Sequence, residues 1–451
     1  MERFFKIKKG LNLNLKGQAQ QNCKKVEMSA EYALSPSDFY GIVPRLVVKE
    51  GEHVMAGSPL FVDKATERIK FVSPVSGMVK AIVRGERRKI LYVTIAAEEK
   101  QQFKDFGEQD LSRLNKEAVL DLLLDSGLFG FFRQRPYDVV ASPLDTPKAI
   151  FISTFSKMPL AADFSYVIEG REAEFSLGIK TLAKLSKVYV GISAEQAENK
   201  LFTSLSDAEV NVFDGPNPAG NVSVHINRVS PINKGEIVWT ISPEIVAIIG
   251  KLVQTGKIDF TRRIALAGSQ IKNPGYVDTI IGAPVADLLK GQLTSDKHVR
   301  LINGNPLVGI KTDFSSYLSA QVSEFCVIPE GDDVHELLGW IAPRLNDFST
   351  NHSYFSWLFG RKKEYDLDCR IKGGERHMIM SCEYESVFPM DIYPSYLIKA
   401  IITGDIDRQE ALGIYEVAPE DFAVAEFIDS SKLELQRIVR EGLDILRKEN
   451  S

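Results

Sequence analysis

Residues 60–77 read LFVDKATERIKFVSPVSG, two apolar runs joined by a charged turn around Lys64. The overlapping stretch of residues 42–62 places apolar residues at near-alternation and has glycines where the chain must turn, which is typical of short β-strands. Residues 73–95 repeat the same design. Because two similar hairpins follow one another, we expect a small, internally duplicated β-sandwich over residues 1–100.

The turn itself raises the question of whether Lys64 carries a prosthetic group. Asp-Lys-Ala followed by Pro-x-x-Gly resembles the lipoyl-carrier domains, but their lysine and proline lie closer together than the ten positions between Lys64 and Pro74. A longer hairpin presents its tip differently, and Arg68 and Lys70 add positive charge beside it. A solvated turn lysine is therefore the favoured interpretation, and a lipoyl- or biotin-type carrier is the alternative.

Composition limits the classes of protein to consider. The chain has 451 residues, 44 % of them hydrophobic and 25 % charged, with a formal charge of -5. This balance is ordinary for a globular protein and gives no sign of nucleic-acid binding. The N-terminus, MERFFKIKKG, lacks the apolar run of a signal peptide, and the most apolar segment, EIVAIIGKLV, is too short to cross a bilayer.

The four cysteines are scattered along the chain and form no Cys-x-x-Cys pair: they are Cys23, Cys326, Cys369 and Cys382. Such spacing predicts neither a zinc site nor an iron–sulfur cluster. In a long chain without a secretory signal, reduced thiols are favoured over disulfides.

After the β segment the pattern changes to helix. Residues 114–127 are apolar around most of a helix and end at Gly127, a suitable helix C-cap. An aromatic and basic linker, residues 127–149, leads into unbroken apolar strands that alternate with helices expected over residues 175–186 and 193–205. This alternation predicts a parallel, Rossmann-like α/β layer.

The rest of the chain divides into a β-rich and a helical part. We expect an α+β multidomain protein with four parts: a biotinyl/lipoyl-like β barrel-sandwich over residues 1–100, the Rossmann-like part over 101–262, a small β-grasp-like domain over 263–375 and a helical part over 376–451. The last helix is expected to begin at Ser431, with Glu434 completing a capping box. Leu435, Val439 and Leu446 then share one face with Ile438 and Gly442.

Motifs along nearly the whole chain resemble those of one family, the A subunits of the Na+-translocating NADH:quinone oxidoreductase. They include IKKGLNLNLKG, RLVVKEGEHVMAGSPLFVDK, SGLFGFFRQRPYD, PKAIFISTFSKMPLAAD, FDGPNPAGNVSVHI, VWTISPEIVAIIGKLVQTGKI, LLGWIAP and the long stretch from FPMDIYPSYLIKAIITGD to EVAPEDFAVAEF. Each motif alone is weak, but their order and spacing make the resemblance specific.

The resemblance implies a cofactor-free peripheral subunit on the cytoplasmic side of the bacterial inner membrane. It would dock on membrane subunits, chiefly the one beside the quinone site, and bind or guide ubiquinone or menaquinone. FAD, FMN, riboflavin and the 2Fe–2S centre are expected in partner subunits only. The family is similar to the Rnf complex C subunit and to the flavin subunit of complex I, but this sequence has no Gly-x-Gly-x-x-G after a strand and no cysteine cluster. The alternative is a purely structural scaffold subunit without quinone contact, and the lysine carrier loses support.

The linker offers the best candidates for quinone contact. Phe131 and Tyr137 can stack on a quinone ring, and Arg133 or Arg135 can polarise a carbonyl oxygen. Packing of the aromatic residues at a domain junction is the competing interpretation. His225, in the motif FDGPNPAGNVSVHIN, stands among apolar residues that read as β structure and is a possible proton donor to quinol.

A structural role is favoured for that second motif, since the family usually has histidines where this chain has Asn217 and Asn227. The carboxylates of residues 405–426 suggest a sodium site at first sight: they are Asp405, Asp407, Glu416, Glu420, Asp421 and Glu426. A solvated acidic face is favoured instead, because sodium passage must occur within the bilayer.

Overall fold

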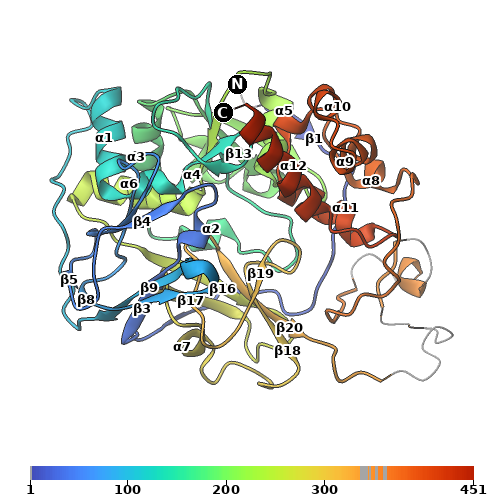
Figure 1. The fold of residues 1–451 in the computed structure, drawn as a ribbon, viewed down its shortest axis with the longest axis horizontal. Helices are drawn as coiled ribbons and strands as arrows, with labels where there is room; N and C mark the ends of the chain where they lie inside the picture. The colour runs from blue at the N-terminus through green and yellow to red at the C-terminus, as the bar shows by residue number, and fades with distance from the viewer. Residues whose placement is uncertain (1–2, 336–343, 345–346, 351–353, 359–362, 451) are drawn as a thin grey trace.

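The computed structural model describes residues 3–335, 344, 347–350, 354–358 and 363–450. The motif LLGWIAP, residues 337–343, which is one of those that carry the family resemblance, lies outside the described residues. Figure 1 shows three β-rich bodies and a group of C-terminal helices that pack around one another. Within the described residues, every helix is too short or too polar to span a bilayer.

The first body consists of two small sheets, as expected for a barrel-sandwich. One sheet has the order β3 (Glu31–Leu34), β9 (Ile90–Ala97), β8 (Gly77–Arg84), β5 (His53–Val54), and the other β4 (Pro44–Leu46), β6 (Pro59–Asp63), β7 (Lys70–Val72). Phe61 and Phe71 stack between them with ring centroids 4.9 Å apart. The core forms because alternate residues of each strand point to one face.

The exposed Lys64 follows β6 in the turn to β7. Two ion pairs fasten this hairpin to helix α1 (Lys116–Ser126): Arg68 pairs with Asp121, and Lys70 with Asp125. A prosthetic-group carrier needs a hairpin tip that projects freely, so these contacts favour the interpretation of Lys64 as an ordinary turn lysine. Helix α1 ends at Gly127, which has a φ of 78° as its predicted role requires.

The second sheet contains seven strands. Their order is β1 (Arg3–Lys6), β14 (Glu209–Asp214), β13 (Val188–Ser193), β12 (Ile150–Ser153), β15 (Val238–Thr240), β10 (Arg133–Arg135), β11 (Val139–Val140). The first five strands pair in parallel, which confirms the predicted α/β layer. The expected linker forms an edge of this sheet instead, because β10 pairs antiparallel with β15.

Helices cover this sheet, chiefly α3 (Glu172–Ala183), α5 (Val222–Val229) and α6 (Pro243–Thr255). The helix expected over residues 193–205 is wrong in its extent. Only the short turns η4 (Ala194–Gln196) and α4 (Lys200–Thr203) form there, since Asn199 accepts a hydrogen bond from the Leu201 N–H at 2.9 Å and begins a new turn.

The third sheet has the order β19 (Ile310–Thr312), β18 (Val299–Asn303), β20 (Glu324–Pro329), β16 (Thr261–Ala267), β17 (Gly275–Ile280), β2 (Cys23–Lys25). Two short helices, α2 (Phe164–Val167) and α7 (Val285–Leu289), lie beside the sheets. Strand β2 from the N-terminus pairs with β17, and β1 with β14. The first 25 residues therefore connect the second and third sheets.

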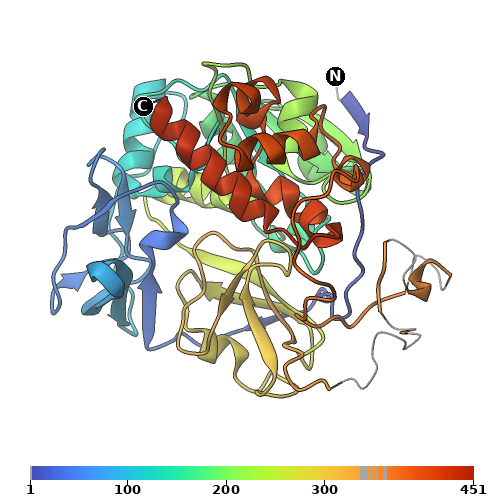
Figure 2. The ribbon, with the colours of Figure 1, turned by 45° about the vertical axis from the view of Figure 1, so that its right-hand side comes forward.

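The C-terminal part is helical, as expected: α8 (Glu383–Val387), α9 (Pro394–Ile402), α10 (Ile406–Ala411), α11 (Ala423–Ile428) and α12 (Leu435–Glu449). In Figure 2 these helices lie in front of the second sheet, above the third sheet. The expected helix start at Ser431 is wrong, because Lys432 has a φ of 59° and α12 begins only at Leu435. Its predicted inner face is confirmed, with Leu435, Val439 and Leu446 buried.

Candidate functional site

A cleft of about 520 Å³ lies where the second sheet, the third sheet and the C-terminal helices meet. Its floor contains the ends of β12 and β15, with Ser153 and Thr240. Strand β12 pairs in parallel with β13 on one side and β15 on the other, so the strand order reverses here. In open α/β sheets, ligands bind at this position, outside the carboxyl ends of the strands.

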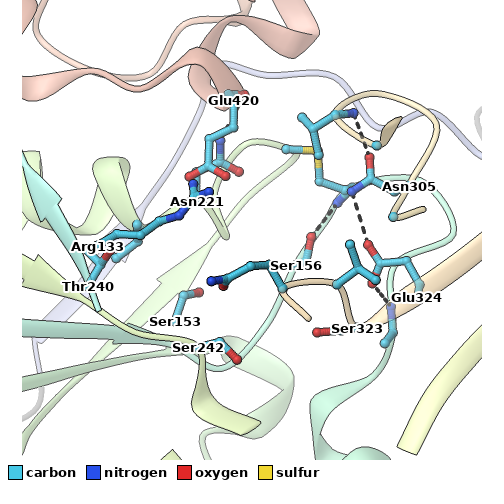
Figure 3. A pocket seen from close by; sticks show the side chains of 18 of the residues that line it. Arg133, Ser153, Ser156, Asn221, Thr240, Ser242, Asn305, Ser323, Glu324 and Glu420 are labelled. Carbon is cyan, nitrogen blue, oxygen red and sulfur yellow. Dashed lines mark hydrogen bonds between the residues drawn. The ribbon is translucent and has the colours of Figure 1, made fainter. Parts of the chain in front are cut away.

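Polar groups from the second sheet, the third sheet and the C-terminal part surround the cleft (Figure 3). Ser153, Ser156 and Ser242 come from the second sheet and its loops, and Asn305 and Glu324 from the third sheet. Glu420 comes from the turn η7 (Pro419–Phe422) before α11. The arrangement combines many hydrogen-bonding groups with apolar side chains such as Phe131, Met158 and Phe164.

Two helices begin at the cleft, and carboxylates of the chain itself stand beside both N-termini. Asn221 precedes α5 and donates to Asp421 Oδ1 at 3.1 Å, with Asp421 only 2 % exposed. Glu244 occupies the first turn of α6 and accepts from Arg262 Nε at 2.6 Å. Helix N-termini carry a partial positive charge and attract anions. At both positions where a phosphate group could bind, a carboxylate of the chain already lies beside this charge.

One wall of the cleft carries two arginines. Arg133 Nη1 lies 3.2 Å from both carboxylate oxygens of Asp138, and Arg135 pairs with Asp138 and with Glu420. Burial opposes ionisation of Asp138, but the guanidinium groups of Arg133, Arg135 and Arg440 outweigh it and lower its pKa to about 2. The Arg133 side chain is 37 % exposed and that of Arg135 is 2 % exposed, so a ligand would reach Arg133.

The other charged groups of the cleft are carboxyls. Burial raises the pKa of Glu420 to about 7, with Arg135 opposing and Asp421 adding to the shift. Burial also raises the pKa of Asp38 to about 6 and that of Glu324 above its usual value. A cleft with several carboxyls and one accessible guanidinium disfavours a polyanion such as a dinucleotide, and suits an uncharged polar ligand.

Of the five residues proposed from the sequence, the structure brings three to the cleft: Phe131, Arg133 and Arg135. The Phe131 ring is largely in the core and contacts Phe39 at a centroid distance of 5.3 Å. Tyr137 turns away, with a φ of 81°. Its carbonyl accepts from Arg440 and its hydroxyl accepts from Asn450 Nδ2 at 3.2 Å. Tyr137 therefore fastens residues 127–149, the segment expected to be a linker, to α12.

His225 lies on helix α5, so its expected β surroundings are wrong. It is 2 % exposed and stacks on Phe213, with ring centroids 3.9 Å apart. Its Nε2 lies 2.9 Å from the Ala219 carbonyl oxygen and donates to it as the neutral tautomer. Burial lowers its pKa to about 4. Proton donation to quinol from this position requires access that the packing does not provide.

The buried histidine makes stability depend on pH. The unfolded chain binds a proton below the ordinary pKa of about 6.5, whereas the folded chain resists it down to a pKa of about 4. The stability that the neutral His225 contributes is therefore fully present above pH 6.5. The free energy of unfolding falls by about 3 kcal/mol as the pH drops from 6.5 to 4. We expect His225→Gln to remove this part of the pH dependence in urea unfolding curves. His53→Gln, at an exposed position, is the control, and equal pH slopes for His225→Gln and the wild type would contradict the prediction.

The acidic stretch is not a solvated face, which corrects that expectation. Asp421 is buried, Glu416 accepts from Asn227 Nδ2 at 2.8 Å, and Glu426 accepts from the Gln436 N–H at 2.7 Å. Asp405 caps α10, and Asp407 is exposed. Apart from the exposed Asp407, these carboxylates accept hydrogen bonds or ion pairs from groups on other segments or at a helix start, and so they hold the helices in place.

Sequence reasoning did not find the cleft residues of the third sheet, Asn305 and Glu324, or Asp38 from the first body. Each stands alone in its segment, without a neighbouring motif. Among the described residues, three side chains come close enough to suggest a metal site: His298, Asp332 and Asp333, whose ligand atoms lie within 4.8 Å of one another. All three are exposed, outside the cleft lining, and such acidic surface groups need no ion.

Three family models match the chain. They are the NqrA N-terminal barrel-sandwich hybrid domain over residues 5–98, the NqrA second alpha/beta domain over residues 114–258, and the NQRA C-terminal domain over residues 263–313. Together they match most of the three β-rich bodies, whereas β20 of the third sheet lies beyond the last match.

Similar proteins extend over the full length. The A subunit of the Na(+)-translocating NADH-quinone reductase of Saccharophagus degradans is 35 % identical over 448 residues, 99 % of this chain and 100 % of the relative. The protein of the same name from Serratia proteamaculans is 36 % identical over 452 residues, again 99 % and 100 % of the two chains. Among solved structures, the NAD+-reducing [NiFe]-hydrogenase in the H2-reduced state covers 49 % of this chain and 50 % of that chain, at 11 % identity and a TM-score of 0.33. That likeness is too slight to bear on fold or function.

Proposed function

The chain belongs to the family of A subunits of the Na+-translocating NADH-quinone reductases, and from this membership we propose that it is a peripheral subunit that docks on the membrane subunits at the cytoplasmic face and binds or guides quinone. The membership makes it a subunit of a translocase, with other subunits of that complex as partners. Flavins and the 2Fe–2S centre reside in those partners under this proposal.

The observation that carries the quinone proposal is the charge pattern of the cleft. A carboxylate of the chain stands beside each helix N-terminus, and Arg133, which pairs with Asp138, is the accessible guanidinium of the cleft. A quinone ring is uncharged and has a carbonyl acceptor at each end. Arg133 donates to one oxygen, and a hydroxyl of the cleft, such as that of Ser242, donates to the other.

The same geometry would assist reduction. Electrons supplied by NADH oxidation elsewhere in the complex place negative charge on the quinone oxygens, and a guanidinium beside one oxygen stabilises that charge more strongly than it stabilises the neutral carbonyl. Arg133 therefore favours the reduced forms while the ring is held. Phe131 supplies part of the apolar contact at the same wall.

Photolabelling with an azido-quinone tests this proposal on the purified complex. We expect label on cleft residues near Arg133, competed by excess quinone. Arg133→Gln should weaken quinone binding about 10- to 100-fold, the effect of losing a charged hydrogen bond. Arg113→Gln, whose side chain is 86 % exposed and pairs with Asp110, is the matched control. Label confined to other surfaces, with unchanged affinity in Arg133→Gln, would contradict the proposal.

A scaffold role without quinone contact is the second candidate, favoured by the structural use of Arg135 and Tyr137. Mild solubilisation of membranes that contain the tagged chain should bring the hydrophobic flavin subunits and sodium-stimulated NADH:quinone reductase activity with it. An assembled and active complex in which Arg133→Gln has no effect on quinone would favour the scaffold. An intact mass above the 50.3 kDa of the bare sequence would reopen the Lys64 carrier alternative.

A further inference from the structure

We propose that the cleft binds a prenylated quinone with its tail leaving over Ile310, so that the face bearing β19 and η7 is the one turned toward the membrane subunits. This inference rests on the proposed quinone function. It adds which part of the molecule lies inside, where the tail leaves, and which residue contacts it.

Ile310 is the feature that points to the exit. It is 73 % exposed and also lines the cleft. A single exposed isoleucine on a protein surface needs no explanation. Here, however, Val308, Val322 and Pro419 line the same cleft, and Val308 and Val322 are half-buried, so Ile310 continues an apolar rim of the cleft outward.

The rim is held in place by the structure around it. The Asn305 side-chain oxygen accepts from the N–H groups of Leu307 and Val308 at 3.0 and 3.2 Å. Gln436 Nε2 donates to the Leu307 carbonyl oxygen at 3.0 Å and ties this turn to α12. Strand β19 pairs with β18 alone and forms the edge of the third sheet within the described part of the chain. The rim is thus preformed, and an extended chain can lie along it without breaking a sheet.

The polarity of the cleft matches the two parts of a prenylated quinone. Figure 3 shows Asn305 and Glu324 on one side of the cleft and Arg133 on the other. Buried apolar side chains such as Met158 and Phe164 also line it, so the interior suits an apolar ring with polar oxygens. The rim has branched aliphatic side chains, which suit an isoprenoid chain. A volume of about 520 Å³ lies within the range of sites for drug-sized ligands, so the ring leaves room for the first part of a tail.

Tail-length dependence of binding to the purified full chain tests the inference. The probes are 2,3-dimethoxy-5-methyl-1,4-benzoquinone and its derivatives with one and two isoprenyl units, with affinity measured by equilibrium dialysis. For the wild type we expect the two-unit tail to tighten binding about tenfold over the bare ring, the effect of burying on the order of 55 Å² of apolar surface. In Ile310→Ser this gain should fall to about threefold or less, with ring affinity unchanged.

Ile371→Ser is the matched control, because Ile371 is 62 % exposed and does not line the cleft. It should retain the full tenfold gain. If the ring binds but Ile310→Ser keeps the full gain, or if Ile371→Ser loses it equally, the exit over Ile310 is overturned and the quinone proposal stands. If neither ring nor prenylated quinone binds the chain or the complex, the proposed function fails and this inference fails with it.

Discussion

Replacing Arg262 by methionine is expected to lower the free energy of unfolding by about 3–5 kcal/mol. Arg262 is 3 % exposed, and its Nε donates to Glu244 at 2.6 Å. Its Nη1 donates to the carbonyl oxygen of Ala320 at 2.8 Å, and Nη2 to that of Val322 at 2.6 Å. Methionine fills much of the same volume but leaves a buried carboxylate and two carbonyls without their donor, which is far costlier than the loss of a surface pair.

Urea unfolding of the purified chain measures this effect. Arg437→Met is the control, because Arg437 lies on α12 and pairs with Glu434 and Glu441 but is 59 % exposed, and its loss should cost less than about 1 kcal/mol. Adding Glu244→Gln to Arg262→Met should recover part of the loss, since no charge then remains buried. An Arg262→Met chain as stable as the control would show that water in the cleft compensates Glu244 on its own.

Elements with a local signal could be predicted from the sequence. Helix α1 ends at Gly127 because a left-handed residue closes a helix there, and that residue is visible in the sequence. The strands β12, β13 and β14 are largely apolar runs, as buried parallel strands must be. In each case the conformation or burial that the fold requires depends on a few neighbouring residues, and those residues are of the type that it requires.

Helix α5 shows where local reasoning fails. Val222, Val224 and Ile226 alternate with other residues as they would in a strand, yet they form a helix. Ile226 and Val224 are fully buried, and His225 is stacked on Phe213. The helix forms because it closes over the sheet after β14, a demand that comes from the tertiary packing and has no counterpart in the local pattern.

For a related reason, the sequence predicted the arginines of the site but not the carboxylate that pairs with Arg135. The linker drew attention to Arg133 and Arg135 through its own composition. The carboxylate partner of Arg135, Glu420, lies 285 residues away in the chain, among other acidic residues that look alike in sequence. Which of several carboxylates is buried depends on the donor that the fold places opposite it, so burial of Asp421 could not be predicted from its neighbours.

The cleft also depends on how closely helix α6 approaches α3, because α6 begins at its edge with Ser242. Two glycines make this approach possible. A Cβ at Gly250 would collide with the carbonyl oxygen of Glu174, and a Cβ at Gly178 would collide with that of Val246. Both obstacles are backbone atoms of the facing helix, which cannot move aside by changing a rotamer.

Gly250→Ala is therefore expected to lower the free energy of unfolding by about 3 kcal/mol or more, even though alanine gains about 1 kcal/mol in helix propensity. Gly374→Ala is the control, since nothing lies within 4 Å of a Cβ there, and it should be neutral. Gly442→Ala should have an intermediate cost, because its Cβ meets only the flexible side chain of Ile401. Urea unfolding gives the order of the three variants. A Gly250→Ala chain as stable as Gly374→Ala would mean that α3 and α6 can separate freely. In that case the position of Ser242 at the cleft could not depend on their contact.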